Sequence, residues 1–133
     1  MTIDVDDVCT ESQLDEFLGG QLGGNQHLRP QAWTSAEPAR QYALDRVVNA
    51  LKRRTPPILE ADLQDVTELR LAVKLGAAHH LYMLAASSGD SAELFAFKAR
   101  DYGKEFDAEI NGLSPTLRGG ARGSTYSFAI ARR

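Results

Sequence analysis

The stretch "DVTELRLAVKLGAAHHLYMLAASS", residues 65–88, decides the fold because it is apolar on most sides when it is drawn as a helix. Its apolar side chains form two stripes with helical spacing. The first stripe contains Leu69, Val73, Gly76, Ala77, Leu81 and Leu84, and the second contains Leu71, Leu75, Ala78, Tyr82 and Ala85. A helix that is apolar around most of its circumference is usually buried between neighbours. We therefore predict that this stretch forms a central helix.

Small residues in the middle of this predicted helix indicate where another helix packs against it. Gly76, Ala77 and Ala78 follow one another, and a glycine costs a helix roughly 1 kcal/mol relative to alanine. Close approach of a neighbouring helix is a physical reason for a glycine at this point. Asp65 and Glu68 have the spacing of a helix cap, so we expect the helix to begin near Asp65.

The next helix is predicted over residues 91–111. Its apolar side chains recur at helical spacing, and they are Phe95, Ala99, Tyr102, Phe106 and Ile110. Only a short polar turn separates this helix from the central one. Two helices joined by a short turn form an antiparallel hairpin.

Two more helices are expected upstream. One should begin near Thr34, which has capping-box spacing from Glu37, and it should end where two prolines follow Thr55. A short helix is predicted within residues 9–20, where Thr10 and Gln13 repeat the capping-box spacing. Residues 19–33 are rich in glycine, asparagine and proline, which is typical of a loop.

The pattern changes after Pro115. The following segment contains three glycines, and then apolar side chains alternate with small or polar ones, which is the period of a β-strand. The glycines are Gly119, Gly120 and Gly123, and the alternating side chains are Tyr126, Phe128 and Ile130. We predict an all-α fold, in which residues 1–112 form a small helical bundle with an antiparallel hairpin. Residues 113–133 are predicted to be an extended C-terminal arm that carries one β-strand.

Charge is unevenly distributed along the chain. Residues 1–18 carry six acidic side chains and no basic one, whereas residues 113–133 carry four arginines and no acid. Opposite charges at the two ends can steer copies of one protein toward each other. The alternative is that both ends are simply solvated.

The predicted strand meets no sheet in the body, so its partner should be another chain. The glycines would then act as a hinge. The expected partner-binding residues of the arm are Arg118, Arg122, Tyr126, Phe128, Ile130, Arg132 and Arg133. The acidic N-terminus of a neighbouring copy is one surface that could receive the arginines.

The chain shows no catalytic signature, and we expect neither an enzyme nor a cofactor or metal. His79 and His80 are adjacent, so their side chains diverge by about 100°, whereas helical zinc ligands are three or four residues apart. No apolar run approaches the roughly 20 residues that span a bilayer, and the acidic N-terminus lacks the apolar core of a signal peptide. A single cysteine, Cys9, fits a reducing compartment.

Residues 63–113 resemble the head–tail connector, or adaptor, proteins of tailed bacteriophages and gene-transfer particles. The helix carries "LRLAV" at residues 69–73 and ends in Leu81-Tyr82. The next helix carries Ala99, Tyr102, Phe106 and Glu109 in the family's order, and "LDRVVNAL" at residues 44–51 is similar to the family's first long helix.

This resemblance implies a structural protein of the virion, located at the head–tail junction and assembled in the bacterial cytoplasm. Family members form rings, typically of twelve copies, between the portal and the next tail component. DNA passes through the lumen without sequence-specific binding. The alternative function is a small nucleic-acid-binding regulator that uses the basic residues 52–54 and the C-terminal arginines. For that basic cluster, a solvated helix end is the simpler interpretation.

Overall fold

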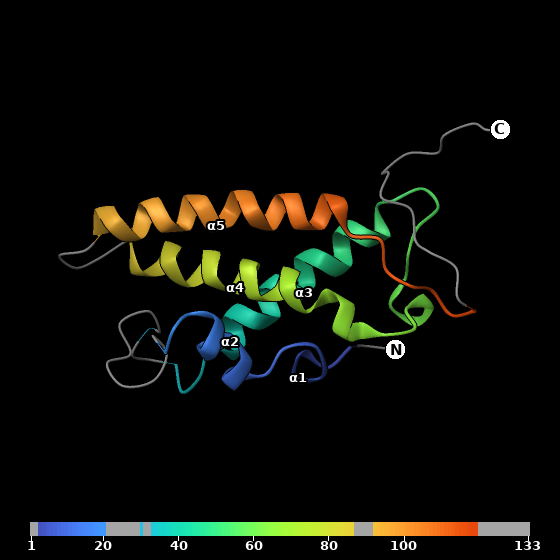
Figure 1. Ribbon diagram of the computed structural model, residues 1–133, viewed down its shortest axis with the longest axis horizontal. Helices are drawn as coiled ribbons and strands as arrows, with labels where there is room; N and C mark the ends of the chain where they lie inside the picture. The colour runs from blue at the N-terminus through green and yellow to red at the C-terminus, as the bar shows by residue number, and fades with distance from the viewer. Residues whose placement is uncertain (1–2, 21–29, 31–32, 87–91, 120–133) are drawn as a thin grey trace.

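The structure is a computed structural model that describes residues 3–20, 30, 33–86 and 92–119 of the 133-residue chain (Figure 1). Across these residues the secondary structure is helical, so the all-α class is confirmed for the described part. The α-helices are α1 (Val5–Val8), α2 (Glu11–Phe17), α3 (Glu37–Lys52), α4 (Arg70–Ala85) and α5 (Ala92–Gly112). Two 3-10 turns, η1 (Glu60–Asp62) and η2 (Val66–Leu69), connect α3 to α4.

Helix α4 is the centre of the fold, as its apolar circumference predicts. Its most extensive contacts are with α3 and α5. Figure 1 shows α4 and α5 side by side with opposite chain directions, and α1 and α2 near the other side of α4. The buried side of the bundle is filled by large apolar side chains, which include Leu14, Leu44, Leu51, Leu69, Leu81 and Phe106.

Side chains of both α3 and α5 lie close to the main chain of α4 at Gly76. A Cβ atom at this position would stand 2.6 Å from Cζ of Phe106 and 2.7 Å from Cβ of Ala43. These separations are far below van der Waals contact, so a side chain at residue 76 would push α3 or α5 away. The predicted close helix packing at Gly76 is confirmed.

The predicted start of the central helix is wrong by one turn. Asp65 does act as a cap, but of η2: its Oδ1 atom accepts hydrogen bonds from the amide of Thr67 at 3.0 Å and from its hydroxyl at 2.6 Å. Helix α4 begins only at Arg70. Glu68 does not complete a capping box because its carboxylate binds Thr116, far along the chain.

The predicted cap of α3 is also wrong. The helix begins at Glu37 with Ala36 at the cap position, and the hydroxyl of Ser35 accepts the Glu37 amide at 3.2 Å. The carboxylate of Glu11 in α2 accepts the Ala36 amide at 3.0 Å. A negative group at a helix N-terminus is favourable because the helix dipole is positive there. Ser35 therefore accepts the amide that the local sequence assigned to Thr34, and a tertiary contact from Glu11 adds a second acceptor at the start of α3.

The predicted cap of α2 is confirmed. The Thr10 hydroxyl accepts the Gln13 amide at 3.2 Å, and the Gln13 side chain accepts the Thr10 amide at 2.9 Å. Gly19 follows the helix with φ of 69°, a left-handed conformation that favours glycine. The capping box holds α2 so that Leu14 is completely buried.

Candidate functional site: the root of the C-terminal segment

The residues that follow α5 run antiparallel to part of the segment that connects α3 to α4. We call residues 113–119 the arm root, because they are the described part of the predicted arm. The main chain of the arm root pairs with residues 62–64 through an antiparallel bridge between Leu63 and Leu117. The Gln64 amide donates to the Thr116 oxygen at 3.0 Å, and the Arg118 amide donates to the Asp62 oxygen at 2.8 Å. Figure 1 shows this arrangement beyond the C-terminal end of α5.

Arg54 binds the start of the arm root through hydrogen bonds to main-chain oxygens. It follows the last turn of α3, and only 4% of its surface is exposed. Its guanidinium donates hydrogen bonds to the main-chain oxygens of Leu113 and Ile110, the latter at 2.6 Å. Carbonyl oxygens at the end of a helix lack partners within that helix and carry its negative dipole end, so a cation is well placed there. The buried arginine thus joins the ends of α3 and α5.

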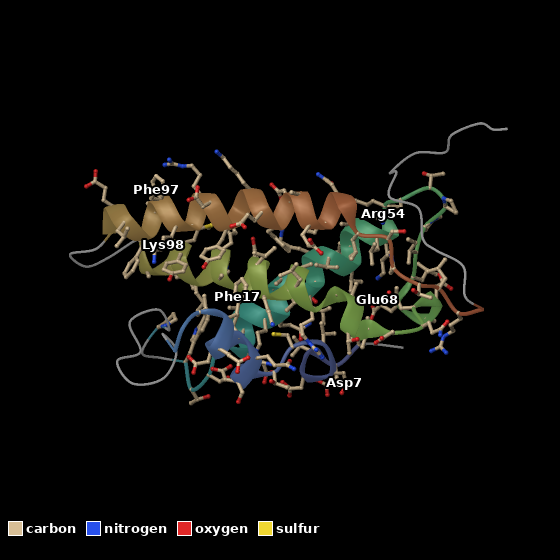
Figure 2. The ribbon with its side chains drawn as sticks, viewed as in Figure 1. Asp7, Phe17, Arg54, Glu68, Phe97 and Lys98 are labelled. Atoms are coloured by element: carbon tan, nitrogen blue, oxygen red, sulfur yellow. The ribbon has the colours of Figure 1, made fainter. Side chains whose placement is uncertain are left out.

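Glu68, which belongs to η2, binds the middle of the arm root through its carboxylate. One carboxylate oxygen accepts the Thr116 amide at 2.7 Å, and the other accepts the Thr116 hydroxyl at 3.0 Å. Figure 2 shows Arg54 and Glu68 at the same end of the molecule, on either side of this segment. Both contacts use a charged group, which makes them stronger than hydrogen bonds between neutral groups.

Apolar burial completes the attachment. Leu113 is 8% exposed, and Pro115 is among the fully buried side chains. Ile58 and Leu63, in the segment that connects α3 to α4, are also almost completely buried. The arm root is therefore held by main-chain pairing, by charged hydrogen bonds and by apolar contact together.

The structure places two of the predicted arm residues. Arg118 donates from Nε to the main-chain oxygen of Ala61 at 2.7 Å, so it is bound to the body. Gly119 has φ of 93°, which suits a change of chain direction. The remaining predicted arm residues lie outside the described part of the chain, namely Gly120, Arg122, Gly123, Tyr126, Phe128, Ile130, Arg132 and Arg133.

The basic cluster at residues 52–54 is not a fully solvated helix end, because Arg54 is buried against main-chain oxygens. Lys52 lies 4.0 Å from the carboxylate of Glu60. Arg53 is exposed. Of the three cations proposed to contact phosphates in the alternative function, Arg54 is therefore committed to the fold.

The acidic N-terminal segment is partly neutralised within the molecule. Arg40 of α3 is 3% exposed and forms ion pairs with Asp6 at 2.6 Å and with Glu11 at 3.3 Å. The same guanidinium donates to the Cys9 oxygen at 2.8 Å. Two of the six acids are thus used to hold α1 and α2 against α3. Burial raises the pKa of the Cys9 thiol, which keeps it protonated and unreactive.

His79 and His80 point in different directions, as their spacing predicts. Nδ1 of His79 lies 2.7 Å from the Ala99 oxygen in α5. His80 stacks on Tyr42 of α3, with ring centroids 4.1 Å apart, and faces Trp33 at 6.3 Å. Trp33 thus makes a ring contact with α4. In the described ranges, no group of three metal-ligating side chains comes together.

Sequence reasoning missed the two side chains that secure the arm root. A basic residue at the end of a helix and an acidic residue near the start of one usually indicate a solvated surface. Nothing in the residues around Arg54 and Glu68 marks them as partners of residues 48 to 59 positions further on. The prolines after Thr55 indicate a turn, but they do not indicate which residues contact each other once the chain has turned.

The comparisons with known proteins found no relative of this chain. No family model matches the chain, and neither a curated protein nor a solved structure matches it. Among the helices that the structure describes, none combines the length and the apolar composition needed to cross a membrane.

Proposed function

We propose that this chain is a non-enzymatic assembly protein that works as a head–tail connector of a phage-like particle. The observation that carries the proposal is the attachment of the arm root. Arg54 and Glu68 hold residues 113–118 at one end of the bundle, so the segment that follows starts from a defined point. A fixed starting point makes a C-terminal segment suitable for reaching a partner chain.

In this proposal the body is a small helical bundle whose α4–α5 pair is an antiparallel hairpin, and residues 120–133 carry the strand that meets a partner. A strand added to an exposed sheet edge gains main-chain hydrogen bonds, and its alternate side chains provide specificity. Copies of the bundle form a ring between the portal and the next tail component, and DNA passes through the lumen. The apolar positions Tyr126, Phe128 and Ile130 face the partner.

The test is a truncation placed where the structure puts the end of the attached segment. Removing residues 120–133 keeps Arg118 and its two contacts with residues 61–62. We expect the shortened chain to retain the helical circular dichroism of the full chain and to lose binding to the portal protein of its particle. Normal docking of the shortened chain, seen by negative-stain microscopy or pull-down, would show that the arm does not carry the interaction.

A matched pair of variants distinguishes binding by the apolar face of the strand from an effect of the length of the arm. Replacing Tyr126, Phe128 and Ile130 with serine should abolish docking, because it removes every apolar side chain from one face of the strand. Replacing Thr125 and Ala129 with serine and Ser127 with alanine changes the other face and should leave docking intact. Equal effects of the two triple variants would contradict the strand assignment.

A further inference from the structure

A small pocket lies between the exposed face of α3 and the last two turns of α5. Its volume is about 230 Å³, and most of its lining is polar or charged, namely Arg46, Asn49, Ala50, Arg53, Asp107 and Ile110. Arg54 holds the two walls together, because it follows α3 and donates a hydrogen bond to the Ile110 oxygen at 2.6 Å. Pockets for drug-sized ligands measure roughly 300–1,000 Å³, so a ligand of this pocket is a smaller molecule.

The α3 wall of the pocket carries two cations. Arg46 and Arg53 are seven residues apart with Asn49 between them, and Arg53 keeps helical backbone angles at the end of α3, so the three side chains share one face. The two arginines are separated by roughly 10 Å along the helix axis. The guanidinium of Arg46 stands over the Tyr42 ring, 5.6 Å from its centroid, and this attraction restricts its position. The wall therefore presents two separate binding points for anionic groups.

These two arginines have no acceptor oxygen among the residues that the structure describes. Their side chains form neither an ion pair nor a hydrogen bond with any of those residues. Four other arginines bind carboxylate or main-chain oxygens, namely Arg40, Arg54, Arg70 and Arg118. A guanidinium has five N–H donors, so the donors of Arg46 and Arg53 remain available to a ligand.

The α5 wall of the pocket carries one carboxylate, that of Asp107. It lines the same pocket as the two arginines, yet it forms no ion pair with them or with any other cation in the described part of the chain. Opposite charges that line one pocket without pairing leave a gap that a ligand can bridge. Asp107 would repel a ligand that carries only negative charge, and the arginines would repel one that carries only positive charge. The molecule that fits therefore carries charges of both signs.

We propose that this pocket binds an acidic α-amino acid, with L-glutamate as the representative ligand. Arg46 and Arg53 each bind one carboxylate of the ligand through charge-assisted hydrogen bonds, and Asp107 accepts hydrogen bonds from its ammonium group. Two negative groups and one positive group in the ligand thus complement two positive groups and one negative group in the pocket. The apolar side chains of Ala50 and Ile110 contact the methylene groups. The proposed connector function does not use this pocket.

The binding experiment compares molecules that differ from L-glutamate by one charged group. Glutarate lacks the ammonium group, and L-glutamine lacks the charge of the side-chain carboxylate. In an NMR titration of the full-length chain, we expect L-glutamate to shift the amide signals of residues 46–53 and 107–110 in a saturable way. Each analogue should bind at least about tenfold more weakly, because it loses a hydrogen-bonded charge pair.

Substitutions in the pocket test the role of each charged side chain. Arg46→Gln and Arg53→Gln should each weaken L-glutamate binding about tenfold, whereas Arg100→Gln, at an exposed position of α5 outside the pocket, should not change it. Asp107→Asn should weaken the binding of L-glutamate and strengthen that of glutarate, because it removes the repulsion of the second ligand. Asp101→Asn is the matched control, since Asp101 is an exposed residue of α5 that does not line the pocket. Circular dichroism of each variant checks that the helices are intact.

Three results would overturn the inference: no saturable shift with L-glutamate, equal affinity for L-glutamate and glutarate, or equal effects of Arg53→Gln and Arg100→Gln. Binding of inorganic phosphate or short duplex DNA in place of L-glutamate, strengthened by Asp107→Asn, would also overturn it and would assign the arginines to phosphate groups. Because the titrations contain no portal protein, their outcome is independent of the proposed connector function. A chain that binds L-glutamate as expected but does not bind a portal would refute only the connector proposal.

Discussion

Arg54 donates a hydrogen bond to the main-chain oxygen of Ile110 across 2.6 Å, and this contact ties the end of α3 to the last turn of α5. The same guanidinium binds the Leu113 oxygen, where the arm root begins. The arginine is buried, but it faces carbonyl oxygens at the negative end of a helix, so its charge is compensated. Several consequences of this packing are open to measurement.

Replacing Arg54 with methionine should lower the free energy of unfolding by about 2 to 4 kcal/mol, because it leaves buried carbonyl oxygens without their charged donor. Urea unfolding followed by circular dichroism measures the change. Arg53→Met is the matched control, since Arg53 is exposed and its replacement should change stability by at most about 0.5 kcal/mol. Equal effects of the two substitutions would show that Arg54 is not buried in solution.

Gly76→Ala should destabilise the protein although alanine favours helices. The added methyl group would meet Phe106 and Ala43 at 2.6 and 2.7 Å. Overpacking costs up to about 3 kcal/mol, and the gain in helix propensity returns about 1 kcal/mol, so we expect a net loss of up to about 2 kcal/mol. Thermal and urea unfolding provide the measurement.

Gly112→Ala supplies the comparison for that variant. A Cβ atom at Gly112 would meet no atom within 4 Å, and the residue closes α5. This substitution should be neutral or slightly stabilising. If Gly76→Ala behaves in the same way, the three helices do not approach each other as closely at residue 76 as the structure indicates.

Glu68→Gln should loosen the arm root without unfolding the bundle. The amide side chain retains one acceptor oxygen, but it places a donor group opposite one of the two Thr116 donors. We expect hydrogen exchange at the Thr116 amide to accelerate by about tenfold, which corresponds to about 1.4 kcal/mol. Exchange in the middle of α4 should not change, and a uniform acceleration along the chain would argue against a local role.

Stability should fall as the pH drops from 8 to 5, with His80 as one cause. Burial, and then the neighbouring His79, lower the pKa of His80. Its ring also faces Tyr42 and Trp33 in a stacked arrangement. Above pH 7 His80 is neutral in both states. Below its ordinary pKa near 6.5, the unfolded chain binds the proton more readily than the folded one, so folding becomes less favourable.

His80→Phe keeps a flat ring between Tyr42 and Trp33 and removes the titrating group. Its urea-unfolding free energy should therefore depend less on pH between 8 and 5 than that of the unaltered chain. Comparing the two slopes cancels the contribution of every other titrating group. Identical slopes would show that His80 does not resist protonation in the folded state.

Periodicity predicted the helices well because helix burial leaves a repeated pattern in the chain. The stripes on residues 69–84 predict a central helix, and α4 is that helix. The capping box of Thr10 and Gln13 was also predictable, since both partners lie within one turn. The expected cap at Thr34 failed because Ser35 and Glu11 accept the amides at the start of α3, and Asp65 caps the η2 turn that precedes α4. The strand in residues 125–131 stays a prediction.

Local patterns in the sequence thus determined which segments are helical, which helix is surrounded by others, and that a glycine marks a close crossing. The tertiary structure alone decided which charged residues became part of the fold. Arg40, Arg54 and Glu68 look like surface residues in sequence, yet each binds groups more than 25 residues away. The physical reason is that a buried charge is tolerated only where the folded chain supplies partners from several segments. Contacts between segments that are distant in the chain produce no periodic pattern in the sequence.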